Sequence, residues 1–305
     1  MFGELGNIAG GVTYQELVEL DDGWGTPAIH YVAERGQLNK ITGGVTAKQL
    51  AQANTEATGK TTLHYAAESG SLDQIDGGAT ADDLITAKNK NGYTALHSAV
   101  HYGHLDQIKG GVTIQQLINA KDNDGQSAIL INADWVDHVK EDLSFDQLAA
   151  VSDREGKTVI HHLASRGQLD KISGGVTVQQ LASLRDSNGT TALEDALVDN
   201  PSVQIPGGLQ PGLLTGDELN RMLDAILTKE YVGTECLQNV QELVRLGADK
   251  NIALTALRDE ASSAQSSHEM ADWQKDRVRF LRGFAEDLGF DVSTAIDPKI
   301  TAQLI

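Results

Sequence analysis

Four histidines recur along the chain at nearly equal intervals and are its most regular residues with metal-binding side chains. They are His30, His64, His97 and His161, which share a spacing of about 33 residues or about twice that spacing. A structural zinc ion needs four ligands that converge on one point, and no second type of ligand recurs beside these histidines. We therefore predict that the histidines have a structural role and that the chain binds no metal.

Two other groups could carry catalysis. Cys236 is the only cysteine, and a place near the start of a predicted helix could lower the pKa of its thiol. A cysteine nucleophile also needs a base, and no local signature surrounds Cys236. His268-Glu269 lacks the second histidine of the H-E-x-x-H zinc-protease motif. We predict that the chain is not an enzyme, while an enzyme with its activity in residues 211–305 is kept as an alternative.

Paired glycines could cradle a phosphate, since backbone N–H groups at a glycine-rich turn attract anions. The pairs recur on the same spacing as the histidines, however, and no G-x-x-x-x-G-K-[ST] motif is present. They are Gly10-Gly11, Gly43-Gly44, Gly77-Gly78, Gly110-Gly111 and Gly174-Gly175. A structural bend explains why the pair recurs at this spacing better than five separate phosphate sites would. We predict bends at these pairs and no bound cofactor.

The histidines and glycines belong to one internal repeat. A Thr-x-Leu-His type of segment returns every 31 to 34 residues, with a glycine five residues before its fourth position and, in most copies, a glycine six residues after it. The copies are Pro27–His30, Thr61–His64, Thr94–His97, Ser127–Leu130, Thr158–His161 and Thr191–Glu194. Self-similarity at a fixed period of this length is the mark of a stacked repeat protein.

The pattern G-x-T-x-L-H-x-A-x-x-x-G over residues 5–205 resembles the ankyrin-repeat family. The resemblance implies an all-α, ankyrin-like repeat solenoid of about six repeats, with short hairpin loops and a first helix that begins at each motif threonine. It also implies that the motif histidines bond backbone groups of an adjacent turn. Repeat arrays of this kind expose a concave surface that binds partners.

The second helix of each repeat departs from the family pattern. In the copy after His97, Leu105–Ile108 is followed by Gly110-Gly111, and a glycine pair within a helix costs about 1 kcal/mol per residue relative to alanine. Thr113 with Gln116 then forms a capping box that starts a new helix. We predict a short helical turn, a glycine bend and a second short helix.

The repeat fades after Pro201, and we divide the chain into an array, 1–205, and a helical C-terminal segment with a degenerate repeat and a cap, 206–305. Four helices are expected in the second part. Thr215 with Glu218 caps the first, Thr255 opens a further degenerate copy, and a last helix ends at about Leu288. On that last helix, Trp273, Leu281, Phe284 and Leu288 form an apolar face, and Lys275, Arg277, Arg279 and Arg282 form a basic patch. The patch is interpreted as a solvated face paired with nearby acids, with an acidic partner as the alternative.

The formal net charge of −19 argues against nucleic acid and anionic membrane surfaces, and favours a partner protein with a basic surface. The resemblance places exposed positions at hairpin tips and on the first helices, where Tyr, Trp and Arg are typical interface anchors. The partner-binding residues predicted on this basis are Trp24, Tyr31, Tyr65, Tyr93, Tyr102, Trp135, His162 and Arg166. The alternative is that some of them pack between repeats, and that the irregular copy around Trp135 is only a local kink.

We conclude from the sequence that the chain is a protein–protein interaction scaffold, expected to be monomeric. A self-associating structural rod is the remaining alternative. No apolar run reaches the 18 to 20 residues needed to cross a bilayer, and no basic residue precedes Arg35, so we expect neither a membrane span nor a signal peptide. The lone cysteine is compatible with the cytoplasm. The resemblance also fits proteins that intracellular bacteria deliver into host cells as effectors.

Overall fold

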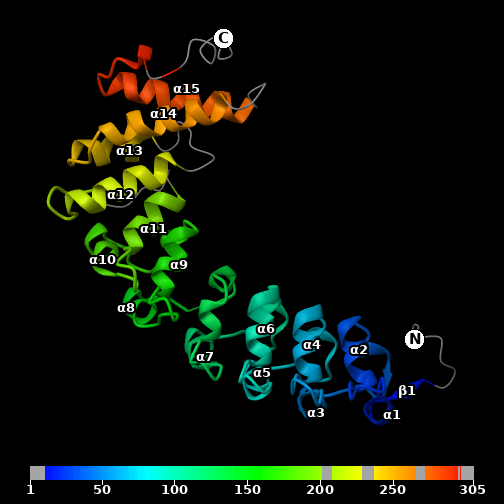
Figure 1. The fold of residues 1–305 in the computed structure, drawn as a ribbon. Coiled ribbons are helices and arrows are strands. Elements are labelled where there is room, and N and C mark those ends of the chain that lie inside the picture. The colour runs from blue at the N-terminus through cyan, green and yellow to red at the C-terminus, as the bar shows by residue number, and fades with distance from the viewer. Residues whose placement is uncertain are drawn as a thin grey trace. The chain divides into compact units, whose positions relative to one another are not determined.

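The computed structural model describes residues 11–139, 141–200, 208–228, 237–265, 272–294 and 296. Within these ranges the chain forms short helices and two strands of two residues each, β1 (Val12–Thr13) and β2 (Ile41–Thr42), which pair in parallel with Val12 opposite Ile41. The chain divides into two compact units, Met1–Arg154 and Glu155–Ile305. The predicted all-α repeat architecture is confirmed (Figure 1).

The first unit consists of two rows of helices (Figure 1). The first helices α2, α4 and α6 pack side by side, and the shorter helices α1, α3, α5 and α7 form the second row beneath them. The bounds are α1 (Tyr14–Glu19), α2 (Ala28–Glu34), α3 (Ala47–Gln52), α4 (Thr62–Ser69), α5 (Ala81–Thr86), α6 (Ala95–Tyr102), α7 (Ile114–Asn119) and α8 (Phe145–Ala149). Leu50, Leu63 and Leu96 are fully buried between the rows, so each repeat buries its apolar side against its neighbours.

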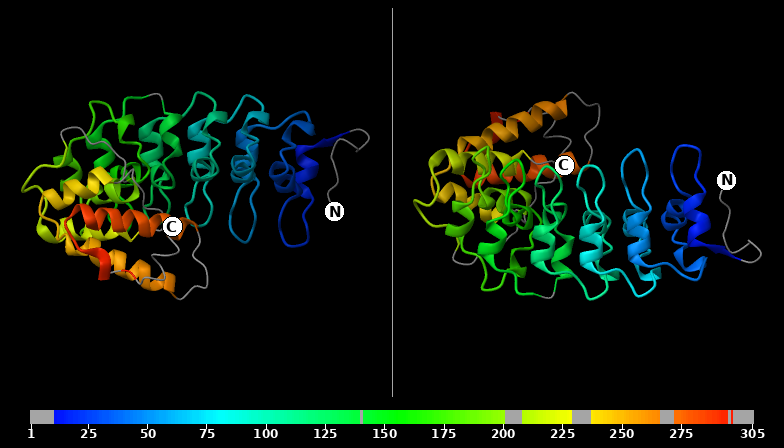
Figure 2. Two further views of the ribbon diagram at one scale, coloured as in Figure 1. Left: turned by 90° about the horizontal axis from the view of Figure 1, so that it is seen from above. Right: turned by 90° about the horizontal axis from the view of Figure 1, so that it is seen from below.

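A hairpin loop leads into each first helix, and the loops of the first unit project in one row on the same side (Figure 2). Lys88 pairs with Thr94 across one such loop, and Gly92 at its tip has φ 73°. A Cβ on Gly92 would lie 2.6 Å from the backbone nitrogen of Asn123 in the next loop. Glycine is therefore required at this tip both by its positive φ and by the close approach of the neighbouring repeat.

The glycine pairs bend the chain as predicted. In the third repeat a 3-10 helix at Leu105–Gln107 is followed by Gly110 and Gly111, with φ 82° and 79°. The Thr113 side chain then accepts from the Gln116 N–H, the Gln116 side chain accepts from the Thr113 N–H, and α7 begins. Equivalent 3-10 helices lie at Leu38–Lys40, Leu72–Gln74 and Leu169–Lys171.

Backbone hydrogen bonds join consecutive repeats at both ends of the helices. On the hairpin side, Lys90 N–H donates to the Thr58 carbonyl at 2.9 Å; on the glycine side, Lys109 N–H donates to the Ala79 carbonyl at 2.8 Å. These bonds satisfy loop backbone groups that would otherwise lack partners where repeats meet. They also fix the stacking of one repeat on the next.

The irregular copy forms a 3-10 helix, Ala128–Leu130, where its neighbours have a longer α-helix. Leu130 replaces the motif histidine and has no side-chain acceptor for the backbone N–H of Ser127, so no capping box forms there. A second 3-10 helix, Asp134–Asp137, follows, and it places Trp135 in the core of the first unit.

The second unit begins with two repeats and continues into longer helices. Its bounds are α9 (Val159–Ser165), α10 (Val178–Ser183), α11 (Ala192–Asp199), α12 (Gly216–Leu227), α13 (Leu237–Arg245), α14 (Asn251–Gln265), α15 (Asp272–Asp287) and a 3-10 helix, Val292–Thr294. Helix α11 packs on α9, α10 and α12, and α14 packs on α12 and α15. In the described residues after 206 the predicted four helices are present as α12 to α15, and Thr215 caps α12 as predicted.

Two details of the C-terminal prediction are wrong. Thr255 does not start a helix, because α14 already begins at Asn251, whose carbonyl accepts from the Thr255 hydroxyl. Trp273 is 40% exposed, whereas Leu281 and Phe284 are buried as expected. The predicted boundary at 205/206 falls among residues 201–207, outside the described part of the chain, and stays a prediction.

Candidate interaction surface

The motif histidines act as N-terminal caps of the first helices. The Nδ1 atom of His64 accepts from the Thr61 N–H at 3.2 Å, which leaves the proton on Nε2, and Nε2 donates to the Tyr93 carbonyl at 3.0 Å. His97 repeats both contacts, with the Thr94 N–H and the Gln126 carbonyl. The predicted bond to the backbone of an adjacent turn is confirmed for His64 and His97. Burial lowers the pKa of both side chains, so both are neutral at pH 7.

His30 is oriented differently because Pro27, at the cap position, has no N–H to donate. Its Nδ1 lies 2.6 Å from the Thr62 hydroxyl of the next repeat, and its ring stacks on Tyr65 with the centroids 4.9 Å apart. Burial, with the nearby positive charge of Lys60, lowers the pKa of His30 to about 4. Among the described residues, no group of His, Cys, Asp and Glu side chains could hold a metal ion.

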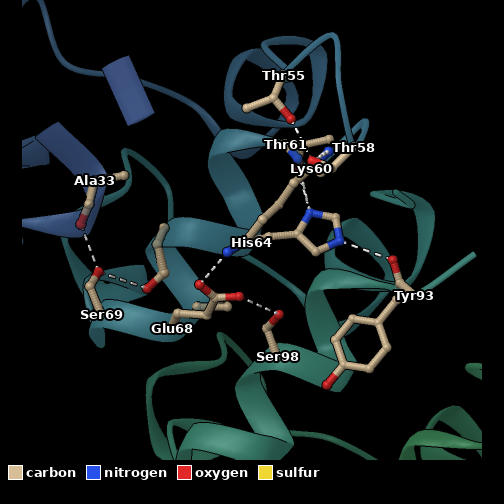
Figure 3. A network of polar contacts seen from close by, with 12 residues as sticks. Ala33, Thr55, Thr58, Lys60, Thr61, His64, Glu68, Ser69, Tyr93 and Ser98 are labelled. Atoms are coloured by element: carbon tan, nitrogen blue, oxygen red, sulfur yellow. Dashed lines mark hydrogen bonds and ion pairs between the residues drawn. The ribbon is translucent and has the colours of Figure 1, made fainter. Parts of the chain in front are cut away.

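A cluster of polar and aromatic side chains lies on the hairpin side of α4 (Figure 3). The ammonium of Lys60 lies 3.9 Å from the centroid of the Tyr65 ring and 2.5 Å from Oε2 of Glu68. The hydroxyl of Ser98, on the next first helix, donates to Oε1 of Glu68 at 3.2 Å. The side chains of Lys60 and Glu68 are 25% and 22% exposed, so the cluster is partly shielded from water while still reachable.

Two further tyrosines place phenols beside carboxylates. The Tyr31 hydroxyl donates to Oδ2 of Asp22 at 2.8 Å, and this bond raises the pKa of Tyr31. Burial raises the pKa of Tyr93 to about 12, with smaller contributions from Glu68 and Tyr102. We name Asp22, Trp24, Tyr31, Tyr65, Glu68, Tyr93 and Tyr102 the acidic–aromatic face. Its members come from the hairpin tips and first helices of three successive repeats.

The predicted binding residues differ in how much of each side chain is exposed to solvent. Trp24 is 88% exposed at its hairpin tip and Tyr102 is 53% exposed, while Tyr31, Tyr65 and Tyr93 are partly exposed. Trp135 is fully buried, and its indole N–H donates to the Ile129 carbonyl at 3.0 Å. The prediction that Trp135 is a binding anchor is therefore wrong, because the 3-10 turn of the irregular copy turns its ring inward.

The remaining predicted anchors, His162 and Arg166, lie in the second unit, where His162 is partly exposed and Arg166 is exposed. The sequence analysis missed Lys60. A signal for it exists, because the position directly before the motif threonine holds Lys60, Tyr93 and Lys157 in three copies. These residues end the hairpin loops and lead into the first helices.

The basic patch on α15 is largely neutralised by local acids. Arg279 pairs with Asp276 and Arg282 with Glu286, both at 2.9 Å, as the solvated-face interpretation predicts. Arg277 is instead buried; it pairs with Glu260 at 2.6 Å and donates to the Leu227 carbonyl at the end of α12. Cys236 and His268-Glu269 lie outside the described residues. No helix among the described residues is both long and apolar enough to cross a bilayer.

Comparison with known proteins supports the repeat assignment. The family model Ankyrin repeat matches residues 91–109, which contain a hairpin tip, α6 and the following 3-10 helix. No curated protein matches the chain. Among solved structures, a chain from the complex of the predatory endopeptidase Bd0816 of Bdellovibrio bacteriovorus with immunity protein Bd3460 is 23% identical, with a TM-score of 0.35, over 56% of this chain and 91% of that chain.

The matched segment shares its features with the copies around it. The Thr-x-x-His cap recurs at Thr61 and Thr158, and the positive-φ glycine of the hairpin recurs at Gly59 and Gly156. Residues 91–109 thus form an ankyrin repeat, and the copies around them share its features.

Proposed function

We propose that the protein is an interaction scaffold whose acidic–aromatic face binds a partner protein with a basic surface. The observation that carries the proposal is the pairing of rings with carboxylates in adjacent repeats. Tyr31 is bonded to Asp22, and burial together with the nearby charge of Glu68 raises the pKa of both Tyr65 and Tyr93. A surface of this composition offers stacking area together with negative charge, and both favour Lys and Arg side chains.

The backbone that carries these rings is held in place before any partner arrives. His64 fixes the carbonyl of Tyr93, and His97 fixes the carbonyl of Gln126 in the next loop. A preorganised surface loses less conformational entropy on binding, so more of the contact energy appears as affinity. Trp24 and Tyr102 add exposed aromatic area at the edges of the face.

The net charge of −19 supports the choice of a basic partner. Complementary charge raises the association rate and makes it sensitive to salt. Binding through this face should therefore weaken as ionic strength rises, mainly through a slower association rate.

The test is affinity capture from a lysate with the intact chain, followed by binding kinetics with the purified captured protein. The variant Tyr31→Ala/Tyr102→Ala should reduce the affinity by about tenfold or more, since aromatic anchors contribute about 1–2 kcal/mol each. His162→Ala/Arg166→Ala is the matched control in the second unit and should bind as the wild type does. Equal affinity of both variants, with folding intact, would reject the acidic–aromatic face as the binding site.

The finer hypotheses from the sequence are tested separately. Monomeric behaviour at all concentrations in light scattering is expected, and concentration-dependent growth would favour the self-associating rod. A translocation-reporter fusion tests delivery into a host cell. Activity-based labelling of Cys236 in the intact chain, with Cys236→Ser as the control, tests the enzymatic alternative.

A further inference from the structure

Lys60 occupies a position that has the composition of a cation-binding site. Its ammonium lies over the face of the Tyr65 ring, and the Glu68 carboxylate closes the site at 2.5 Å. An aromatic face and a carboxylate together are the groups that proteins use to recognise a Lys or Arg side chain. Here the cation is supplied by the chain itself (Figure 3).

The walls of this site are fixed by the two neighbouring repeats. The Tyr65 ring stacks on His30 of the preceding repeat, with an angle of 26° between the ring planes. The second oxygen of Glu68 accepts from the Ser98 hydroxyl of the following repeat. We expect both walls to stay in place if Lys60 leaves, because each keeps a contact with a neighbouring repeat.

An arginine fits these walls better than the resident lysine. A guanidinium is planar, is more weakly hydrated than an ammonium and can stack on an aromatic ring while it pairs with a carboxylate. Lysine is a compact, strongly hydrated charge on a flexible stem. The partial exposure of Lys60 leaves its ammonium a path to water when it is displaced.

We propose that Lys60 is an internal occupant of a cation site, and that an arginine of a basic partner displaces it to stack on Tyr65 and pair with Glu68. This inference rests on the proposed function and names the chemistry that the acidic–aromatic face recognises. Because only the fraction of molecules with Lys60 displaced is competent to bind, the resident lysine lowers the apparent affinity for the partner.

The test uses a fluorescent hexa-arginine peptide, with hexa-lysine for comparison, and measures binding by anisotropy. Lys60→Gln and the control Lys88→Gln each change the net charge from −19 to −20. Lys88 lies in the next hairpin, and its ammonium donates to the Lys121 carbonyl at 3.4 Å. Lys60→Gln should bind hexa-arginine about tenfold more tightly than Lys88→Gln does. Equal affinities would overturn the proposal.

A second set of variants separates an open site from a structural ion pair. Adding Glu68→Gln to Lys60→Gln should abolish the gain, and adding Tyr65→Leu should abolish the preference for arginine over lysine. Lys60→Met should show the same increase in affinity for hexa-arginine, which would show that the increase comes from loss of the lysine and not from the new glutamine. If all variants bind hexa-arginine but the Lys60 variants bind no more tightly than Lys88→Gln, the proposed displacement of Lys60 is rejected. The acidic–aromatic face is then retained as the binding surface. If no variant binds either peptide, both the displacement of Lys60 and the acidic–aromatic face as a binding surface are rejected.

Discussion

Two lysines at the same repeat position, one in each unit, have different partners. Lys60 precedes the motif threonine of the second repeat, pairs with Glu68 in its own repeat and has its ammonium over the Tyr65 ring. Lys157 precedes Thr158 in the second unit and pairs with Asp195 on α11, the first helix of the following repeat, at 3.0 Å. Asp195 is 9% exposed, so the Lys157 pair ties two repeats together.

The residue after the motif histidine accounts for the difference. It is Tyr65 in the first case and His162 in the second, so only the first lysine has a phenol ring beneath it. The repeat position determines where the lysine leaves the backbone. The neighbouring side chains determine whether its charge pairs beside an aromatic ring within one repeat or ties two repeats together.

The caps differ in a related way. His97 caps α6 as a neutral acceptor and bonds the next loop, whereas Glu194, at the same position, caps α11 as a carboxylate. Glu194 pairs with Arg221, and Arg185 pairs with Glu218, the cap of α12. The second unit thus joins its last repeat to its C-terminal helices by charge, where the first unit joins its repeats through histidines.

The largest expected effect comes from Trp135, which has no counterpart in the second unit. Trp135→Ala should destabilise the first unit by about 3–5 kcal/mol, because it opens a large cavity and leaves the Ile129 carbonyl without its donor. Hydrogen exchange should show lost protection in α6 and α7, with α12 and α14 as the internal reference. Uniform protection in both units would show that the ring contributes little to the core.

The two kinds of cap can be compared directly. His97→Ala should cost about 2 kcal/mol, since it leaves buried backbone groups of Thr94 and Gln126 unpaired. His97→Gln should recover part of this loss, because glutamine serves as the capping acceptor at Gln116. Urea denaturation measures both. If the glutamine variant is no more stable than the alanine variant, the capping role of the ring is minor.

The two units should also differ in their response to acid. Burial lowers the pKa of His30 to about 4 from 6.5, and lowers the pKa of His64 and His97. As pH falls below about 6.5, the unfolded chain therefore takes up protons that the folded chain does not, and stability is lost down to the folded pKa. The second unit has one such motif histidine, His161.

The first unit should thus lose more stability than the second between pH 7 and pH 5. Hydrogen exchange at the two pH values, corrected for the intrinsic exchange rate, resolves the units. Replacing His64 and His97 with glutamine should reduce the difference. An equal loss in both units would show that these histidines do not dominate the acid response.

The smallest effect is expected where the units are alike. Thr113 and Thr177 form the same capping box with Gln116 and Gln180. Thr113→Ala and Thr177→Ala should each cost about 1 kcal/mol. Urea denaturation of the two variants should give nearly equal losses, and a difference of more than twofold would show that the surrounding repeats change the strength of the cap.

Sequence alone determined the features that depend on residues close together in the chain. The glycine bends, the starts of α7 and α12, and the first helices that follow Thr61 and Thr94 are set by hydrogen bonds that span three residues and by positive φ angles. These interactions recur whenever the residue types recur, so the repeat period revealed them.

Only the tertiary structure decided which side chains face a partner and which face another repeat. The burial of Trp135 and the hydrogen bond from Ser98 to Glu68 depend on how neighbouring repeats stack. Contacts between residues about 30 apart follow from the distance and rotation between repeats, which no local pattern encodes. For this reason the sequence predicted residues of the candidate face, but neither the burial of Trp135 nor the bond from Ser98 to Glu68.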